Sequence, residues 1–558
     1  MYKKTLALSA LVGFIIGIFW KSDWQWSLEA AQVVAGIISL PAHNPMAIFA
    51  THLYAPFLIW PQVGLLRLGF SSEYISVLFS GLQSGFSFMS VTALLLVLSK
   101  DRVISIVIPI IFAYFSNSLF AGHSYDIFFP TNLNNGGVFA FYTVILAIAS
   151  LGAGSVMMFM LLLGILPILH PGMAMGVWLG AIGYYIIADQ EHRKHFQKNI
   201  RWMLYGFGFF VATVIIHRLL SGSFFEHATA TEKQIVDYFV TFVDGHRRPK
   251  LLPLSWGEKL GYFEPELMLL FATWLFSSRY KRFILDGAQI VLKFLGAMCV
   301  IGMVMTILWE MYSLSFPNIL KTVMYARWLN FDSIMLPLFL VGAMSYQYAW
   351  RRIITLCMIF ILGGMGPNVW RWIFIALICC LEAEINVPNW VKFVNRRIPN
   401  WLTGVVALIV SIIVFGAFIQ KGVRPAMVHS PSQSALISKI SQGEGLYISS
   451  YQALPLPQAM TNRGLVFNLY WIDTMTYVPT MADEMETILR DVYGISIFDR
   501  GIWPSLDIMR THWENRTLMQ WQAIKAKYNA TDVLVPKSWI LTLPVVIQSE
   551  TLTVYHIP

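Results

Sequence analysis

The sequence is poor in charged residues. Of its 558 residues only 12% are charged, whereas about a quarter are charged in an ordinary soluble domain. Hydrophobic residues make up 57% of the chain, and the mean hydropathy is +0.61. This shortage of charge excludes a soluble enzyme, a disordered chain and a coiled coil. It indicates a mainly α, polytopic membrane protein.

Cysteine and the common catalytic motifs are also scarce. The four cysteines, Cys299, Cys357, Cys379 and Cys380, lie in apolar runs, where a thiol behaves as a small hydrophobic group. No Cys/His spacing resembles a metal cage, so no metal ligands are predicted. The GxSxG, Walker, GxGxxG and HExxH motifs are absent. Interpretations as a soluble hydrolase, an ATPase or a nucleotide-binding protein therefore have no support.

Long apolar runs are abundant. A membrane span needs about 20 apolar residues, or somewhat fewer if its ends lie at an interface. Thirteen segments meet this description and predict about 13 transmembrane helices. They are Thr5–Trp20, Tyr74–Leu98, Val103–Phe120, Val138–Ala153, Ser155–His170, Met173–Ala188, Trp202–Leu220, Pro265–Ser277, Ile290–Trp309, Ser333–Tyr348, Ile353–Met365, Val369–Leu381 and Leu402–Ile419.

The basic residues predict the direction of the chain. With the N-terminus in the cytoplasm, every cytoplasmic segment except the short turn 151–154 carries Lys or Arg, as cytoplasmic loops favour. The odd number of spans then places residues 420–558 outside. Because loop asymmetry accounts for the net charge of +9, nucleic acid is not an expected partner. The first apolar run is expected to remain as a helix, since Phe19-Trp20-Lys21 is a poor cleavage site.

Two domains follow from this topology. Residues 1–419 are predicted to form the membrane domain, and residues 420–558 a small extracytoplasmic α/β domain. The outer loops of the membrane domain are 21–73, 121–137, 221–264 and 310–332. In the second domain, alternating apolar residues and turn signals predict strands at 447–451, 465–467 and 532–536, with helices at 482–492 and 515–527.

The first outer loop contains a polar stripe. Gln25, Glu29 and Gln32 are spaced by four and three residues on an otherwise apolar helix, which we expect to begin at Ser22 and to lie flat in the membrane interface. Glu29 and Asp23 are candidate general bases, because a carboxylate at such an interface can have a shifted pKa. The alternative is a solvated polar face.

A second short helix is predicted over Met46–Tyr54, after the break at His43-Asn44-Pro45. His43 and Asn44 are candidates for binding the substrate, although a lone histidine is more often structural.

The second outer loop is rich in hydrogen-bonding groups. His123 and Asp126 lie in it, and the turn at His170 is predicted to face the same side. These three residues are candidates for one substrate-binding cavity. The alternative is an Asn/Gly turn that only satisfies backbone groups.

Cations also occur on the side of the membrane where the loop rule predicts few of them. His246, Arg247 and Arg248 lie in the third outer loop, and Arg327 lies in the fourth. Arginine suits bidentate binding of phosphate, so these residues are candidate ligands of an anionic lipid head group. A solvated basic turn is the alternative.

This arrangement resembles the GT-C class of membrane glycosyltransferases. The resemblance rests on the architecture and on short stretches: Gly122–Asp126 and Asn134-Asn-Gly136, Leu163–Pro171, His246-Arg-Arg-Pro249, and Arg327. It implies a sugar donor on a polyprenyl phosphate and an acid of the first loop as base, a role that falls on Asp23 or Glu29. The Asp-x-Asp or Glu-x-Asp signature of the class is absent from this loop. The resemblance therefore names no certain cofactor and leaves the use of a divalent cation open.

The expected activity is transfer of a sugar from a lipid-linked donor to a glycan, lipid or protein acceptor at the outer face of the membrane. The expected location is a bacterial plasma membrane, with the C-terminal domain extracytoplasmic. Membrane lipids are expected partners. Two alternatives stay open: a lipid or polysaccharide transporter or flippase, and a non-catalytic membrane assembly factor.

Overall fold

The computed structural model describes most of the chain. The described residues are 2–20, 23–52, 56–119, 136–221, 227–244, 284–312, 320, 325–346, 349–363, 400–420, 429–451, 453–499 and 505–558, with scattered positions between 255 and 275.

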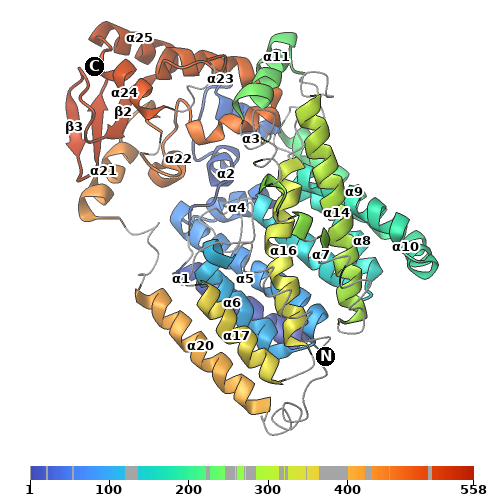
Figure 1. Ribbon diagram of the computed structural model, residues 1–558. Helices are drawn as coiled ribbons and strands as arrows, with labels where there is room; N and C mark the ends of the chain where they lie inside the picture. The colour runs from blue at the N-terminus through green and yellow to red at the C-terminus, as the bar shows by residue number, and fades with distance from the viewer. Residues whose placement is uncertain are drawn as a thin grey trace, which may run out of the picture.

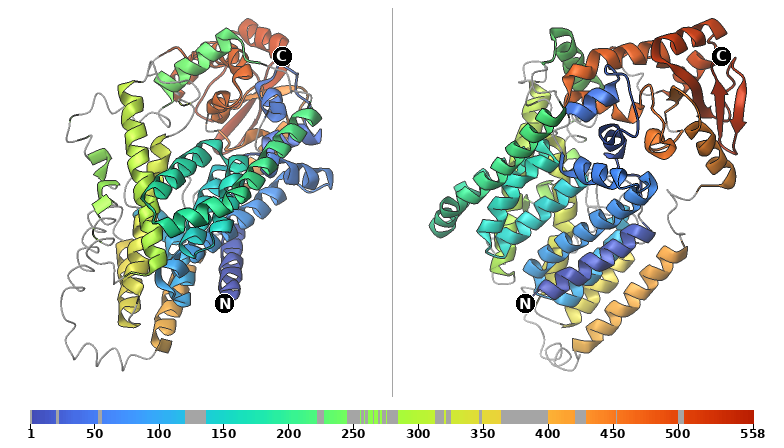
Figure 2. Two further views of the ribbon diagram at one scale, coloured as in Figure 1. Left: turned by 90° about the vertical axis from the view of Figure 1, so that its right-hand side faces the viewer. Right: turned by 180° about the vertical axis from the view of Figure 1, so that it is seen from behind.

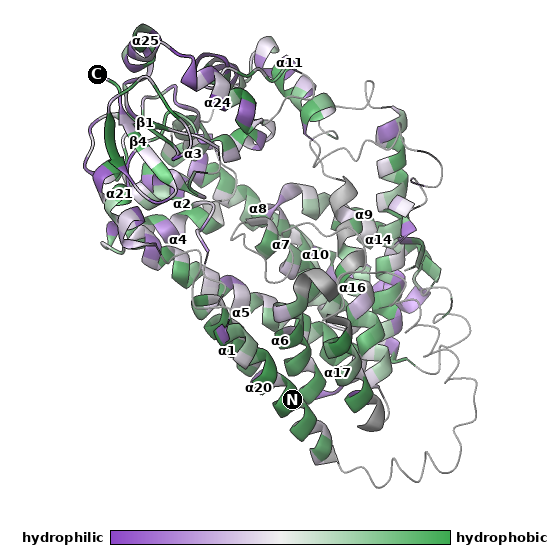
Figure 3. Cartoon of the chain, turned by 60° about the vertical axis from the view of Figure 1, so that its left-hand side comes forward, coloured by the Kyte–Doolittle hydropathy of each residue, from purple (hydrophilic) through white to green (hydrophobic). Residues whose placement is uncertain are grey.

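A bundle of apolar helices forms the larger part of the molecule (Figure 1). Its hydrophobic core runs through most of these helices, and Figure 3 shows them mainly in the colour of hydrophobic residues. The helices are α1 (Lys3–Phe19), α5 (Ser72–Ser99), α6 (Arg102–Leu119), α7 (Gly136–Gly152), α8 (Val156–Leu169), α9 (Pro171–Ile187), α10 (Gln190–Ser221), α14 (Asp286–Met311), α16 (Tyr325–Ser345), α17 (Ala349–Gly363) and α20 (Asn400–Gln420).

The prediction of thirteen spans is not supported. Within the described residues, four helices are long and apolar enough to cross a membrane: Ser72–Ser99, Gln190–Leu220, Asp286–Met311 and Trp401–Gln420. Others are apolar but short. The 14 residues of α8 rise about 21 Å, less than the roughly 30 Å of a bilayer core. The predicted span Val369–Leu381 lies outside the described residues.

Small residues bring neighbouring helices of the bundle close together. A Cβ atom on Gly17 of α1 would lie 2.4 Å from the carbonyl oxygen of Ser80 on α5. Gly164 of α8 and Gly206 of α10 meet in the same way, because a Cβ on either would lie 2.9 Å from the Cα of the other. The backbones can therefore approach as they do at small-residue contacts between membrane helices.

The first loop folds over one end of the bundle as three short helices. They are α2 (Leu28–Ala35), α3 (Pro45–His52) and α4 (Pro56–Arg67). Helix α3 confirms the helix predicted near Met46–Tyr54. The predicted start of the preceding helix at Ser22 is wrong, since α2 begins at Leu28. It ends at Ala35, because the following Gly36 has a φ of 78°.

The C-terminal domain is a four-stranded sheet with helices beside it (Figures 1 and 2). The strands lie in the order β1-β2-β4-β3, with β1 parallel to β2 and the other pairs antiparallel. The strands are β1 (Leu446–Ser449), β2 (Ala530–Pro536), β3 (Val545–Gln548) and β4 (Leu552–His556). The helical elements are α21 (Pro431–Ser441), α22 (Pro457–Thr461), η3 (Leu469–Thr476), η4 (Pro479–Met481), α23 (Ala482–Ile488), η5 (Leu489–Tyr493), α24 (Leu506–Glu514) and α25 (Leu518–Tyr528).

These elements confirm the predicted α/β character and the strands at 447–451 and 532–536. The predicted strand at 465–467 is reduced to an isolated bridge between Leu465 and Tyr447.

The first loop and the C-terminal domain share one hydrophobic core. Trp24, Leu28 and Ala31 of the first loop are buried in the same cluster as Tyr447 and Trp471 of the C-terminal domain. The helix α11 (Ala230–Tyr238) and the short π-helix η1 (Phe239–Val243) that follows it also contribute to this cluster. The chain boundary near residue 420 is therefore not a boundary of the core.

Candidate functional site

Glu29 lies at the centre of the contact between α2 and the C-terminal domain. Its side chain is 0% exposed. The Oε1 atom accepts hydrogen bonds from the backbone N–H groups of Gln458 (2.9 Å) and Ala459 (3.4 Å). The Oε2 atom accepts from the Asn468 amide (3.0 Å) and the Trp471 indole (2.7 Å). Both oxygens thus meet donors only.

Local structure explains why these donors face Glu29. Gln458 and Ala459 stand in the first turn of α22, where backbone N–H groups have no partner within the helix. Asn468 is the N-cap of η3, and its Oδ1 atom accepts from the N–H of Tyr470 at 3.1 Å, which turns its amide nitrogen towards Glu29. The ring of Trp471 is held between Trp26, at 4.9 Å, and Phe49, at 4.8 Å, between ring centroids.

The environment of Glu29 is that of a structural carboxylate. Burial raises the pKa of Glu29, and the hydrogen bonds from Asn468, Trp471 and the two backbone groups oppose that rise. Because all four partners donate, they suit a carboxylate that accepts and leave no exposed oxygen for a substrate hydroxyl. Glu29 is placed to bind the C-terminal domain to α2, and this geometry does not support its candidacy as a general base.

The rest of the polar stripe makes the same contact. Gln25 and Gln32 are fully buried, so the alternative of a solvated polar face is wrong. The Gln32 amide donates to Asn462 Oδ1 (2.8 Å) of the C-terminal domain and to Ser72 Oγ (3.0 Å) at the start of α5. The backbone N–H of Gln25 donates to Ser76 Oγ at 3.2 Å. The stripe is therefore polar because it fills an interface between three parts of the chain.

The two predicted substrate-binding residues that follow have different surroundings. Asn44 is buried, and its amide donates to the carbonyl oxygens of Leu465 (3.1 Å) and Val466 (3.0 Å). Its Oδ1 atom accepts from the N–H of Met46 at the start of α3. These contacts give Asn44 a second docking role. His43, by contrast, is exposed.

Asp23 differs from Glu29 in exposure and in partners. It is half-buried between the end of α1 and the start of α2, and its Oδ1 atom accepts from the N–H of Trp24 at 2.9 Å. Burial raises the pKa of Asp23 to about 7, and the bond from Trp24 opposes the rise. A carboxyl group that titrates near neutral pH can take up and release a proton under working conditions. Of the two predicted bases, Asp23 has the electrostatics for the task.

His170 lies where the bundle meets the C-terminal domain. It is the N-cap of α9, and its Nδ1 atom accepts from the N–H of Met173 at 3.2 Å. Its ring meets Tyr477 of the C-terminal domain edge to face, with 6.4 Å between centroids. His170 thus borders the same junction as the first loop.

The other predicted binding residues are not placed. His123, Asp126, His246, Arg247 and Arg248 lie outside the described residues. The backbone of Arg327 belongs to the first turn of α16, but its side chain is outside the description. A shared cavity of first-loop acids and later arginines therefore stays a prediction.

Two buried acids were missed by the sequence interpretation. Glu266 is 0% exposed, and neither of its carboxylate oxygens has a hydrogen-bond partner among the described residues. Glu310, at the end of α14, is 3% exposed. The sequence could have identified Glu266, because it falls inside the predicted span Pro265–Ser277. An ionisable residue within an apolar span is by default a candidate functional residue.

Comparisons with known proteins add no relative. No protein-family model, no curated protein and no solved structure matches the chain. Within the part of the chain that the structure describes, no three His, Cys, Asp or Glu side chains are grouped to hold a metal ion.

Proposed function

We propose that the chain is a membrane glycosyltransferase that moves a sugar from a polyprenyl-phosphate donor to an acceptor at the extracytoplasmic face of a bacterial plasma membrane. The observation that carries the proposal is Asp23, a half-buried acid with a pKa of about 7, held beside a loop that is covered by the C-terminal domain. The resemblance to the GT-C class predicts a first-loop acid in this role.

The chemistry assigns one step to each group. Asp23 takes the proton from an acceptor hydroxyl, whose oxygen then attacks the anomeric carbon of the donor. The bond between that carbon and the phosphate oxygen breaks, and the electron pair leaves with the phosphate. The arginines predicted from the sequence, Arg247, Arg248 or Arg327, stabilise the charge that develops there. Glu29 contributes by holding the loop that carries Asp23.

A transfer assay tests this proposal. The chain in liposomes is given radiolabelled mannose, glucose or galactose on a polyprenyl phosphate, and transfer to endogenous or added acceptors is measured. Asp23→Asn should lower the rate by about a hundredfold or more, because the amide cannot accept the proton. Glu73→Gln is the matched control, since Glu73 is an exposed acid at the end of the same loop. Equal rates for wild type and Asp23→Asn would exclude Asp23 as the base.

A transporter of lipid-linked sugars is the second candidate, and Glu266 is the observation that favours it. Glu266 is buried and its carboxylate has no hydrogen-bond partner among the described residues. Burial of such a group is costly, and transporters keep buried acids on substrate or proton pathways. Flux of a fluorescent lipid-linked oligosaccharide across liposomes, with Glu266→Gln as the variant, tests it. Flux in the wild type that is lost in Glu266→Gln, with no transfer of sugar, would favour transport over transfer. If the chain shows neither flux nor transfer, the result would favour an assembly factor.

A further inference from the structure

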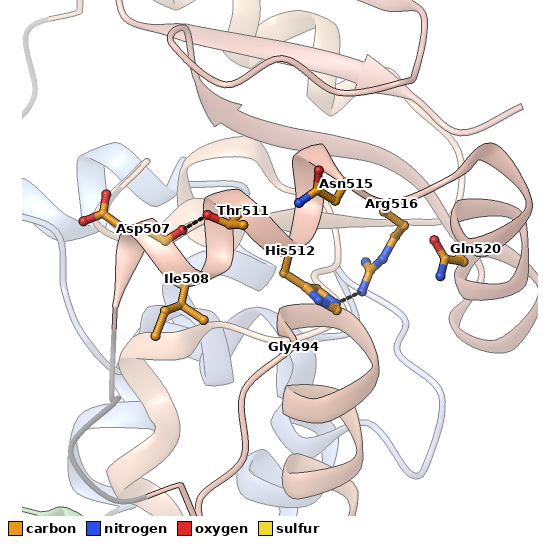
Figure 4. A pocket seen from close by; sticks show the side chains of 8 residues that line it. All are labelled: Gly494, Asp507, Ile508, Thr511, His512, Asn515, Arg516 and Gln520. Atoms are coloured by element: carbon orange, nitrogen blue, oxygen red, sulfur yellow. Dashed lines mark hydrogen bonds between the residues drawn. The ribbon is translucent and has the colours of Figure 1, made fainter.

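The C-terminal domain has a hollow that the proposed transfer site does not use. It lies along α24 and the start of α25 (Figure 4). Its volume of about 590 Å³ falls within the range of about 300–1,000 Å³ that is usual for small-molecule sites. Asp507 and Thr511 on one face of α24, and Asn515 at the C-cap of that helix, line it at intervals of four residues.

The one arginine that lines this hollow is directed inward. Arg516 is 5% exposed, and its guanidinium donates to the carbonyl oxygens of Val492 (3.1 Å) and Asp491 (2.7 Å). It also lies over the ring of Trp521, 4.7 Å from the centroid. These contacts direct N–H groups of the guanidinium to the protein rather than to a ligand in the hollow.

The histidine beside it is placed as a hydrogen-bond acceptor. Arg516 contacts His512 Nε2 at 2.6 Å, a distance that fits donation from the guanidinium to an unprotonated ring nitrogen. Burial and the charge of Arg516 lower the pKa of His512. Asp507 adds a carboxylate at the edge of the hollow. The site therefore disfavours phosphate and other anions.

The remaining groups suit a ligand rich in hydroxyls. Among the described residues, neither the Asn515 amide nor the Asp507 carboxylate has a side-chain partner in the protein. Gln520 accepts from the N–H of Thr517 at 2.8 Å through its oxygen, and its NH₂ group is left to donate. Ile508, 38% exposed, gives an apolar patch beside these polar groups. Neutral donors and acceptors next to an apolar surface match the hydroxyls and C–H face of a sugar ring.

Gly494 lines the hollow where the backbone passes close to the His512 ring. Gly494 has a φ of 68°, and a Cβ atom there would lie 2.3 Å from the His512 ring. Only glycine fits this close approach without displacing the ring.

We propose that this hollow binds a neutral glycan. The inference rests on the proposed function for the role of that glycan, which it identifies as the acceptor class of the transferase. The binding itself requires no donor and no transfer step, so the two proposals can fail separately.

Saturation-transfer NMR on the full chain in lipid nanodiscs tests the inference without sugar-based detergents. Maltotriose, cellotriose and chitotriose are the neutral probes, and glucose 1-phosphate is the anionic probe. We expect saturable binding of at least one neutral probe, at least tenfold weaker in Asn515→Ala and in Asp507→Ala. Gln522→Ala, an exposed change on α25 outside the hollow, should bind as the wild type does.

The outcomes separate the alternatives. Absence of binding by all neutral probes, equal binding by Asn515→Ala and wild type, or preference for glucose 1-phosphate would each overturn the inference. If the wild type binds a glycan, Asn515→Ala does not, and the wild type shows no transfer, this inference holds and the proposed transferase is rejected. If Asn515→Ala does not change the transfer rate, the hollow does not bind the acceptor of the transferase.

Discussion

Replacing Glu29 by glutamine should release the C-terminal domain from α2. The substitution keeps the shape of the side chain but turns one accepting oxygen into a donating NH₂ group. Whichever way the amide is oriented, this group faces two N–H donors, either those of Gln458 and Ala459 or those of Asn468 and Trp471. Two hydrogen bonds are lost in both cases.

The structure sets the magnitude of this effect. A buried donor left without a partner costs about 1–3 kcal/mol, so two of them cost about 2–4 kcal/mol once partial relaxation is allowed for. At about 1.4 kcal/mol per tenfold change, the undocked population rises about 30- to 700-fold. Glu29→Ala leaves all four donors unpaired and should cost about 3–5 kcal/mol, the range for breaking a buried charged network.

Hydrogen exchange measures this opening. The backbone amides of Gln458 and Ala459, which donate to Glu29, should exchange faster in Glu29→Gln by the same factor as long as exchange proceeds through undocking. Glu73→Gln, at an exposed acid, should leave these amides unchanged. Unchanged exchange of both amides in Glu29→Gln, together with a loss of transfer, would refute the docking role and restore Glu29 as the base.

Four further predictions test other parts of the structure. Burial raises the pKa of Asp23 from 3.8 to about 7, so the transfer rate should increase with pH through about 7. By the same shift, the contribution of Asp23 to stability is present below pH 3.8 and is lost as the pH rises through about 7. Thermal unfolding of Asp23→Asn should not show this loss of stability. A cysteine at exposed Ser434 should react with an impermeant thiol reagent in intact cells, and labelling only after permeabilisation would reverse the predicted topology. Gly17→Val should destabilise the bundle by at least about 1–3 kcal/mol, because its Cβ would lie 2.4 Å from a backbone oxygen of α5, whereas Gly208→Ala, with no atom within 4 Å, should not lower the melting temperature. Residues 429–558 expressed alone should aggregate or melt without cooperativity, because their core lacks the first loop, and a cooperative melt would show an independent domain.

Local patterns predicted the elements whose signals are local. The strand at β2 and the helix at α3 follow from alternating apolar residues and from a break at Pro45, and both are found. Strands β3 and β4 were missed; in β3 the sequence Val-Val-Ile-Gln shows no alternation of apolar and polar residues. Thirteen spans are not supported among the described residues, because several apolar helices of the bundle have the composition of spans without their length.

The importance of Glu29 could be predicted, but its role could not. Helical spacing identified the polar face of α2, yet it could not show what meets that face. The partners Asn468 and Trp471 lie 439 and 442 residues away in the sequence, so their contact depends on the complete fold. The same limit applied to Gln32, whose partner Asn462 is 430 residues away.

The docking contact and the proposed base lie on one short segment, which couples them. Asp23 and Glu29 are six residues apart, and a chain of that length spans at most about 21 Å. With Glu29 fixed by four hydrogen bonds and the N–H of Gln25 bonded to Ser76 of α5, the segment is held at both the C-terminal domain and the bundle. A base must be placed to within about half an ångström to be effective. Undocking of the C-terminal domain would therefore change the position of Asp23 indirectly, through the segment that joins it to Glu29. This coupling gives a reason for burying a glutamate at an interface where a hydrophobic contact would be cheaper in free energy.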